Sequence, residues 1–281
     1  MRVLERIAYL LERSREPTYR VRAFRNAAAA VASAGPSRVA ELAAAGRLTE
    51  LRGVGDSTAR VVTETLAGRV PEYLVRLEES AEPETEVEGA TRALLDQLRG
   101  DCHSHSDWSD GGSPIEVMAR AARDLGHEYL VLTDHSPRLT VANGLSAERL
   151  RSQLDVVADL NEELHPFRIL TGIEVDILED GALDQERELL AALDVVVASV
   201  HSKLRMDAEG MTARMLRAVQ DPDVDILGHC TGRIVVGRGR PPSSFDAKAV
   251  FAACAASDTA VEINSRPERL DPPDELLAVA V

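Results

Sequence analysis

From residue 97 onward the chain alternates short apolar runs with polar clusters and stretches of helical periodicity, in units of about thirty residues. The apolar runs, which we predict to be strands, are Leu98–His105, Tyr129–His135, Ile169–Val175, Val195–His201, Val224–His229 and Ala260–Asn264. The helical stretches between them are Ser113–Leu125, Ser146–Leu164, Asp184–Leu193, Met211–Val219 and Asp246–Ser257. This alternation indicates an α/β fold with a parallel sheet, and six or more units favour a closed barrel over an open sheet.

The first eighty residues carry a different pattern, typical of a small all-α domain. Helices are expected at Val3–Ser14, Tyr19–Ala34 and Ser37–Ala45, with Gly35-Pro36 ending the second. Further on, Gly53 and Gly55 permit a tight hairpin, and Asp56 or Ser57 can cap the helix that begins there. Backbone N–H groups at such a helix start are free donors that suit a DNA phosphate, although a plain helix–helix turn explains the two glycines equally well.

Charge divides the chain at the same place. Residues 1–80 contain 13 Arg and 10 acidic residues, a net charge of +3, whereas the whole chain carries −15 and the remainder therefore −18. A basic module joined to an acidic body suits nucleic-acid binding, with ordinary surface variation as the alternative. The segment 80–89 alternates Glu with small residues and predicts a solvated linker. We expect a helical domain at 1–80, an acidic linker and lead-in helix at 81–96, and an α/β domain at 97–281.

The composition indicates the class of protein and the compartment in which it is expected. Hydrophobic residues make up 44% of the 281 residues, enough for a core built mostly of Ala, Val and Leu. No stretch approaches the roughly 18 apolar residues of a membrane span, and the start of the chain is unlike a secretory signal. Three cysteines at unrelated spacings argue against a disulfide framework, so a reduced, cytoplasmic location is expected.

Histidines gather at the carboxyl ends of the predicted strands. Five of the seven lie there, on four strands, and Glu174 lies at the same level on a fifth; the five are His103, His105, His135, His201 and His229. The carboxyl ends of barrel strands converge on one mouth, where active sites assemble. One such histidine would more often be a buried structural side chain, but five at matching heights predict a site for Zn, Mn or Fe. Cys102 and Cys230 are out of phase with the histidines and are interpreted as packing residues.

Residues 1–78 resemble the helix-hairpin-helix amino-terminal domain of family X DNA polymerases, through the segment Arg22–Ala28 and the hairpin residues 53–55. The resemblance implies binding to the DNA backbone without sequence specificity, with candidate contacts at Gly53, Val54, Gly55, Arg22, Arg25 and Arg60. Some members remove abasic sugar through a lysine Schiff base, but Val61 stands at that position. The only lysines are Lys203 and Lys248, and arginine cannot form the imine, so no lyase activity is expected.

Five further motifs resemble the polymerase-and-histidinol-phosphatase (PHP) domain. They are DCHSHSDWSDG at 101–111, TDHS at 133–136, GIEVDI at 172–177, ASVHS at 198–202 and GHCTGR at 228–233. The segments Val141–Ser146 and Glu262–Asp271 look most like the version fused to bacterial family X polymerases. The resemblance covers 101–281 and implies a distorted seven-stranded (β/α) barrel that holds up to three divalent metals and cleaves phosphoester bonds.

The resemblance also implies roles for individual residues. Carried over by position, a first metal would be held by His103, His105 and Glu174, a second by Glu174, His201 and His229, and a third by Asp110 and His135. Glu174 and Arg233 are the expected catalytic residues, with Arg233 clamping a phosphate oxygen or, alternatively, forming a surface ion pair. Trp108 is a candidate to stack on a base, although packing is the commoner role for such a tryptophan.

The chain departs from the PHP pattern near its end. That pattern closes with an Asp-x-His motif on a last strand, and no such motif lies between Asn264 and Val281. We expect the sequence to be a truncated form of a longer protein, because a barrel without that strand would expose an apolar edge. If it is complete, two of the metals would be under-coordinated. A polymerase palm is also absent from the sequence, so nucleotide polymerisation is not predicted.

These observations predict a metal-dependent phosphoesterase acting on DNA, a 3′–5′ exonuclease or 3′-end-processing enzyme of DNA repair. A second hypothesis is a small-molecule phosphomonoesterase of the histidinol-phosphatase type, which uses the same metals but gives the hairpin no role. A third is a DNA-binding module with an inactive barrel that only recruits partners.

Overall fold

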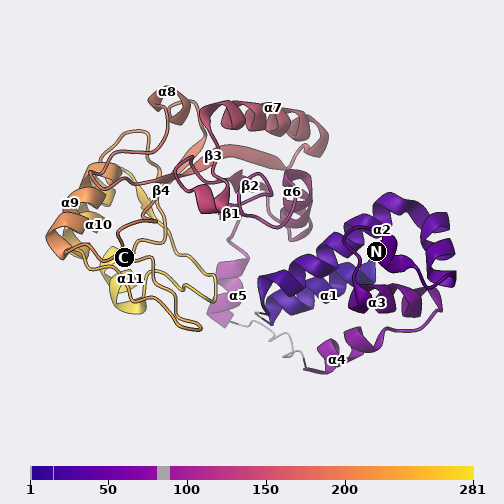
Figure 1. Ribbon diagram of the computed structural model, residues 1–281. Helices are drawn as coiled ribbons and strands as arrows, with labels where there is room; N and C mark the ends of the chain where they lie inside the picture. The colour runs from indigo at the N-terminus through magenta and orange to yellow at the C-terminus, as the bar shows by residue number, and fades with distance from the viewer. Residues whose placement is uncertain (1, 15, 81–88) are drawn as a thin grey trace. The chain divides into compact units, whose positions relative to one another are not determined.

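The computed structural model describes residues 2–14, 16–80 and 89–281, and the chain divides into two compact units, Met1–Thr91 and Arg92–Val281 (Figure 1). Residues 81–88 of the predicted acidic linker lie outside the described residues. The lead-in helix predicted within 81–96 is α5 (Gly89–Leu95), which buries none of its side chains. Among the described residues, no helix is both long enough and apolar enough to cross a bilayer.

The described part of the first unit is helical, as its sequence pattern predicts. Its elements are α1 (Arg2–Arg13), α2 (Thr18–Ala44), the 3₁₀ turn η1 (Leu48–Glu50), α3 (Asp56–Leu66) and α4 (Glu72–Ser80). The backbone of α2 breaks at Gly35, with φ 74° and ψ 159°, so the predicted break is confirmed. Leu4, Ile7 and Leu11 lie on one face of α1 and are buried in the apolar core of this unit, where α1 contacts α2 and α4.

The hairpin between η1 and α3 requires glycine at one position. Gly53 has φ 98°, and a Cβ there would lie 3.3 Å from a backbone carbonyl oxygen of α2. The predicted helix cap at Asp56 or Ser57 is wrong, because Gly55 is the N-cap of α3. The N–H of Gly55 donates to the Thr58 hydroxyl at 2.9 Å, so the hydrogen bond that closes this helix start comes from within the first turn.

The second unit is built on a parallel sheet whose strands follow the order of the chain and curl into a half-barrel (Figure 1). The strands are β1 (Gly100–Ser104), β2 (Tyr129–Leu132), β3 (Arg168–Asp176), β4 (Val195–Ser199), β5 (Ile226–Leu227) and β6 (Ala260–Val261). The α/β fold with a parallel sheet is therefore confirmed. β1 and β6 lie at the two ends of the strand order and do not pair with each other, so the described strands form an open half-barrel and not the closed barrel that the sequence favoured.

Helices cover this sheet and close its apolar core. They are α6 (Ile115–Asp124), α7 (Ala147–Leu164), α8 (Arg187–Leu190), α9 (Ala208–Val219), α10 (Ala247–Ala256) and α11 (Asp274–Ala280), with a 3₁₀ turn η2 (Thr140–Ala142). α6 and α7 pack on β2 and β3, whereas α9 and α10 pack on each other and contribute to the core around β4. The last five residues of β3 are all buried, so this strand runs through the interior.

All strands except β3 end earlier than predicted, and this difference shapes the site. One to three residues after the ends of β1, β2, β4 and β5 come His105, His135, His201 and His229. His103 and Glu174 lie inside β1 and β3. Because parallel strands end at the same edge of a sheet, their side chains meet there, and most of the histidines reach it from loops.

Candidate metal centre

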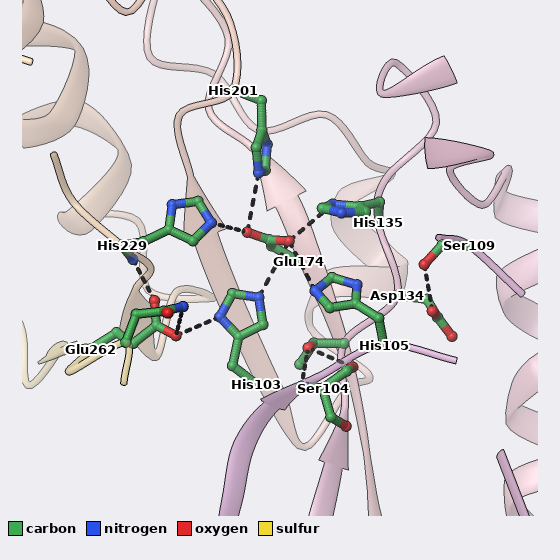
Figure 2. Close-up of polar contacts among 12 residues, drawn as sticks. His103, Ser104, His105, Ser109, Asp134, His135, Glu174, His201, His229 and Glu262 are labelled. Atoms are coloured by element: carbon green, nitrogen blue, oxygen red, sulfur yellow. Dashed lines mark hydrogen bonds and ion pairs between the residues drawn. The ribbon is translucent and has the colours of Figure 1, made fainter. Parts of the chain in front are cut away.

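Glu174 is the centre of a cluster of imidazole rings (Figure 2). Its side chain is 1% exposed. Its two carboxylate oxygens lie 2.8–3.3 Å from ring nitrogens of His103, His105, His135, His201 and His229. Oε2 faces the first three of these rings and Oε1 the last two. Side chains from four strand ends thus converge on one buried carboxylate from the fifth.

The backbone around β3 explains this convergence. The N–H of Glu174 donates to the carbonyl of Asp134 at 3.2 Å, and the N–H of Ser136 donates to the carbonyl of Glu174 at 3.0 Å. His135 therefore pairs directly with Glu174 across a parallel bridge, although β2 itself has already ended. On the other side, β4 pairs with the last five residues of β3, and this pairing places His201 beside the same carboxylate.

Two sets of three residues have ligand atoms close enough together to hold an ion. One set is His103, Glu174 and His229, and the other is His105, His135 and Glu174; within each set the atoms lie within 4.8 Å of one another. The resemblance had placed His103 and His105 on the same ion, so proximity favours a different division of the ligands. Both divisions share Glu174. The assignment of ligands to separate ions stays a prediction.

Asp110 approaches the cluster from the loop after β1. Its Oδ1 lies 3.7 Å from Nδ1 of His105 and 3.5 Å from Nε2 of His135. The hydrogen bond from His135 holds the pKa of Asp110 below its ordinary value, which keeps this half-exposed carboxylate ionised. Gly111 lets the loop close, because a Cβ there would lie 2.4 Å from the carbonyl oxygen of His105. All seven predicted ligands therefore lie in one region.

Burial and the central carboxylate act on the rings in opposite directions. Burial opposes protonation of His103, but the charge of Glu174 and its hydrogen bond outweigh it and raise the pKa of His103 to about 10. At His135 burial is outweighed by the contacts with Asp110 and Glu174, which raise its pKa to about 9. Burial dominates at His105, where it lowers the pKa to about 3, and it also lowers the pKa of His229. His105 and His229 are therefore neutral, the form in which imidazole binds a cation.

Several buried atoms of the cluster form no hydrogen bond of acceptable geometry. They are Nδ1 of His105, Nδ1 of His135, Nδ1 of His229, both ring nitrogens of His201 and Oε1 of Glu174. Buried polar atoms are normally satisfied, so this concentration of unsatisfied ligand atoms requires an explanation. Imidazole nitrogens and carboxylate oxygens converging in this way fit divalent Zn, Mn or Fe. The residues present therefore fit the multi-metal site that the sequence predicts.

Glu262 is a site residue that sequence reasoning missed. Its Oε1 lies 2.8 Å from Nδ1 of His103, and its other oxygen accepts a hydrogen bond from the backbone N–H of His229 (Figure 2). A carboxylate behind one ring nitrogen fixes the orientation of the ring, so Glu262 turns Nε2 of His103 toward Glu174. The signal was present in the sequence, since Glu262 directly follows an apolar strand at the same end as the histidines.

Asp134 anchors the loop that carries Asp110. It is buried and accepts hydrogen bonds from the N–H of Ser106 at 2.8 Å, from the Gln153 amide at 2.7 Å and from the Ser109 hydroxyl (Figure 2). These bonds join the loop after β1 to helix α7 through one carboxylate. They explain why a half-exposed aspartate keeps a fixed position beside two imidazoles.

Arg233 is engaged with backbone. Its Nε donates to the carbonyl of Arg269 at 2.9 Å, and its Nη2 donates to the carbonyl of Leu270. Among the residues that the structure describes it forms no ion pair, which does not agree with the surface ion pair expected as the alternative. Its role as a phosphate clamp stays a prediction.

The remaining residues singled out near the site are packing residues or lie outside the ligand sets. Trp108 is partly buried and packs against two apolar clusters of the second unit, as the commoner role for such a residue predicts. Cys230 is buried, as its interpretation as a packing residue requires, but Cys102 is exposed, so the same interpretation of Cys102 is wrong; neither cysteine belongs to the two ligand sets. Burial raises the pKa of the Cys230 thiol, which keeps it protonated and a poor metal ligand.

The hairpin of the first unit uses some of the N–H groups that were expected to be free. The N–H of Val54 donates to the carbonyl of Leu51 at 2.9 Å, and the N–H of Gly55 is bonded to Thr58. The side chain of Val54 is buried in the core of the unit. The prediction of free donors is therefore wrong for these two residues, because they close the turn itself. Gly53 shapes the turn through its backbone.

The arginines predicted to contact DNA lie on two helices. Arg22 is exposed on α2, and Arg60 is exposed on α3. Arg25, also on α2, is partly exposed and pairs with Glu12 of α1. Contacts of these arginines with DNA stay predictions.

Two family models match the chain, and each match lies within one of the two units. The family model described as a PHP domain matches residues 101–265, and the one described as a helix-hairpin-helix domain matches residues 1–70. The DNA polymerase/3′-5′ exonuclease PolX of Bacillus subtilis is 42% identical over 194 residues, which are 69% of this chain and 34% of that protein.

Other relatives are named for a different activity. A protein named probable phosphatase from Thermoanaerobacter sp. is 32% identical over 170 residues, covering 59% of this chain and 64% of that protein. Another probable phosphatase, from Aliivibrio fischeri, is 29% identical over 172 residues, covering 59% and 62%. The chain thus spans about a third of PolX and less than two thirds of these phosphatases.

Proposed function

The chain belongs to the PHP domain family, and on this premise we propose that it is a metal-dependent phosphoesterase that acts on DNA. The observation that carries the proposal is the convergence of five imidazoles on the buried carboxylate of Glu174. The names of the relatives, an exonuclease and phosphatases, describe cleavage of phosphoester bonds. Hydrolysis is the reaction class common to both.

In this proposal the seven predicted ligands hold the ions, with Glu174 shared. Divalent ions held there would supply charge to neutralise phosphate oxygens and would lower the pKa of water enough to provide a nucleophile at neutral pH. The chain's own residues fix the arrangement. Glu262 holds the ring of His103, and Asp134 holds the loop of Asp110. No side chain has to act as a covalent nucleophile.

We propose that the preferred substrate is a DNA 3′ end. The support is the helix-hairpin-helix domain at 1–70 and the PolX relative, whose name includes a 3′-5′ exonuclease. The first unit would hold the sugar–phosphate backbone without reading sequence, through the positive end of α3 and the arginines on α2 and α3. The second unit would hydrolyse the terminal phosphodiester.

The relatives named probable phosphatases favour one further candidate, a small-molecule phosphomonoesterase with the same metal centre. The two functions differ in what they require of the substrate. A monoesterase needs only the metal centre, whereas an exonuclease also needs contacts along a strand. The ratio of the rates on a DNA oligonucleotide and on p-nitrophenyl phosphate therefore separates them.

The test is hydrolysis of a 5′-labelled oligonucleotide by the full chain with added Mn²⁺. We expect a ladder of products shortened from the 3′ end, which disappears in His103→Ala. His127→Ala is the matched control, because His127 lies between α6 and β2 and has no part in the cluster. Hydrolysis of p-nitrophenyl phosphate alone would favour the monoesterase. Absence of hydrolysis on both substrates would contradict the proposed function.

A further inference from the structure

Two loops next to the metal centre concentrate positive charge in an otherwise acidic unit. We call residues 232–240 and 264–271 the arginine loops. Their acidic residues are Glu268 and Asp271, and their basic residues are Arg233, Arg238, Arg240, Arg266 and Arg269. The chain after residue 80 has a net charge of −18, so this local excess of arginine opposes the charge of its surroundings.

The arginine loops form one connected surface. Each loop is closed by an antiparallel bridge, Ile234 with Arg240 in the first and Asn264 with Asp271 in the second. Three hydrogen bonds join the loops. The N–H of Val235 donates to the carbonyl of Glu268 at 2.7 Å, and the side chain of Arg233 donates to the carbonyl of Arg269 at 2.9 Å and to that of Leu270. Arg233 therefore positions the other arginines.

Both loops begin at the metal centre. The first follows His229 by three residues, and the second follows Glu262 by two. Asp271, in the second loop, accepts hydrogen bonds from the Thr231 hydroxyl at 2.9 Å and N–H at 3.1 Å, which ties it to the turn after His229.

The charges of two half-buried arginines in the loops are not paired. Among the residues that the structure describes, neither Arg240 nor Arg269 forms an ion pair, and Nη1 of Arg269 is buried without a hydrogen bond. Burial lowers the pKa of Arg240; the charge of Arg269 adds to this effect, whereas the charge of Asp271 opposes it. Partly buried guanidinium groups that form no ion pair are suited to an anion, and their planar N–H groups match phosphate oxygens.

The loops also present exposed guanidinium groups beyond this pair. Arg238 lies at the tip of the first loop, between Gly237 and Gly239, whose φ values of 61° and 62° shape the turn. Arg266 is exposed on the second loop, and its Nε lies 3.7 Å from a carboxylate oxygen of Glu268. Positive groups therefore continue from the buried pair to the surface.

We propose that the arginine loops bind the sugar–phosphate backbone of a polynucleotide strand whose terminal phosphodiester lies at the metal centre. This inference rests on the proposed function and names the surface that binds its substrate, because a small phosphomonoester at the metal centre has no further phosphates to contact the exposed Arg238 and Arg266. Contacts to successive phosphates supply affinity without sequence preference. An acidic unit needs such a surface to bind DNA beside its own metal centre.

The test compares two double variants of the full chain. Arg238→Ala with Arg266→Ala removes two exposed charges from the arginine loops. Arg123→Ala with Lys248→Ala removes two exposed charges from α6 and α10 and is the matched control. Binding of a fluorescein-labelled single-stranded oligonucleotide is measured against salt concentration, and KM and kcat for its hydrolysis are measured with Mn²⁺. Circular dichroism and bound metal show whether each variant is folded.

We expect the loop variant to bind the oligonucleotide roughly tenfold more weakly, with a salt dependence shallower by about 1.4 in log–log slope, as for two lost contacts to a single strand. Its KM should rise to the same extent at similar kcat, whereas the control stays within about twofold of wild type. Equal affinity and slope for the wild type and the loop variant would overturn the inference. A binding defect confined to the loop variant, together with no hydrolysis by the wild type, would support this surface and contradict the proposed function.

Discussion

The two units of the chain use their buried positions in opposite ways. In the described part of the first unit the buried residues are apolar, apart from Thr58. In the described part of the second unit sixteen polar or charged residues are buried, among them Glu174, Asp134 and Asp271. Buried polar networks contribute less to stability than apolar packing does, and they require every partner in place. The first core is thus built for stability, and the second includes a chemical site.

The comparison predicts that substitutions of buried residues have different consequences in the two units. A buried substitution in the first unit should lower the free energy of unfolding and leave the metal centre intact. A buried substitution at the site in the second unit should change metal binding and hydrolysis more than folding. Four variants test this contrast, in order of decreasing expected effect.

Glu174→Gln should have the largest effect. It keeps the shape of the side chain but removes the negative charge that all five imidazoles share, so we expect hydrolysis to fall by about 10³-fold or more. The measurement is the hydrolysis rate with Mn²⁺. Glu275→Gln, exposed on α11, is the control and should behave as wild type. A Glu174→Gln rate near that of wild type would contradict the claim that the second unit contains a chemical site around Glu174.

Leu11→Ala should destabilise the first unit by about 3 kcal/mol, because Leu11 is fully buried in its core and the truncation leaves a cavity. Urea unfolding followed by circular dichroism gives the free energy. Leu66→Ala, at a position 52% exposed on α3, should cost no more than about 0.5 kcal/mol. Metal binding should be unchanged in both variants. A loss of metal in Leu11→Ala would show that the two units are not independent.

Glu262→Gln should weaken metal affinity by about 10- to 100-fold, since the orienting carboxylate behind His103 is lost while the ligands remain. Titration with Mn²⁺, followed by calorimetry, measures the affinity. Unfolding of the first unit should not change. Wild-type affinity in this variant would mean that Glu262 does not position the ring of His103.

Gly53→Ala should have the smallest effect, a cost of about 1–2 kcal/mol to the first unit, because it combines a left-handed φ with a close contact to the carbonyl of Asn26. Gly35→Ala is the comparison variant for this measurement. Gly35 also has a positive φ, but a Cβ added there would meet no atom within 4 Å, so this variant reports the φ contribution alone. Thermal unfolding should therefore show a larger loss for Gly53→Ala than for Gly35→Ala.

The same contrast explains how much of the molecule could be predicted from sequence. Helical periodicity predicted α1, both parts of α2 and α3 but not α4, and the break at Gly35 followed from local chemistry. The order of strands and helices predicted the parallel sheet. The cap at Gly55 was missed because the hydrogen bond from its N–H to Thr58 depends on a side-chain geometry that propensity does not describe.

At the site, the sequence predicted the residue types but not their pairing. The histidines and Glu174 were found because chemistry-bearing residues followed apolar runs at one end of the sheet. Their division into two sets around Glu174 depends on strand registers and loop paths, which a single sequence does not specify. Glu262 and the unpaired Arg269 were missed for the same reason, since each acquires its role only from a neighbour that is distant in sequence.

The central claim is that Glu174 and the imidazoles around it hold divalent ions. Its most direct test is the metal content of the full chain, measured by inductively coupled plasma mass spectrometry after incubation with Mn²⁺, Zn²⁺ or Fe²⁺ and removal of free ions. We predict at least one tightly held equivalent for the wild type and a marked loss for Glu174→Gln. A wild-type protein that retains no ion, or a Glu174→Gln protein that retains as much, would contradict the claim.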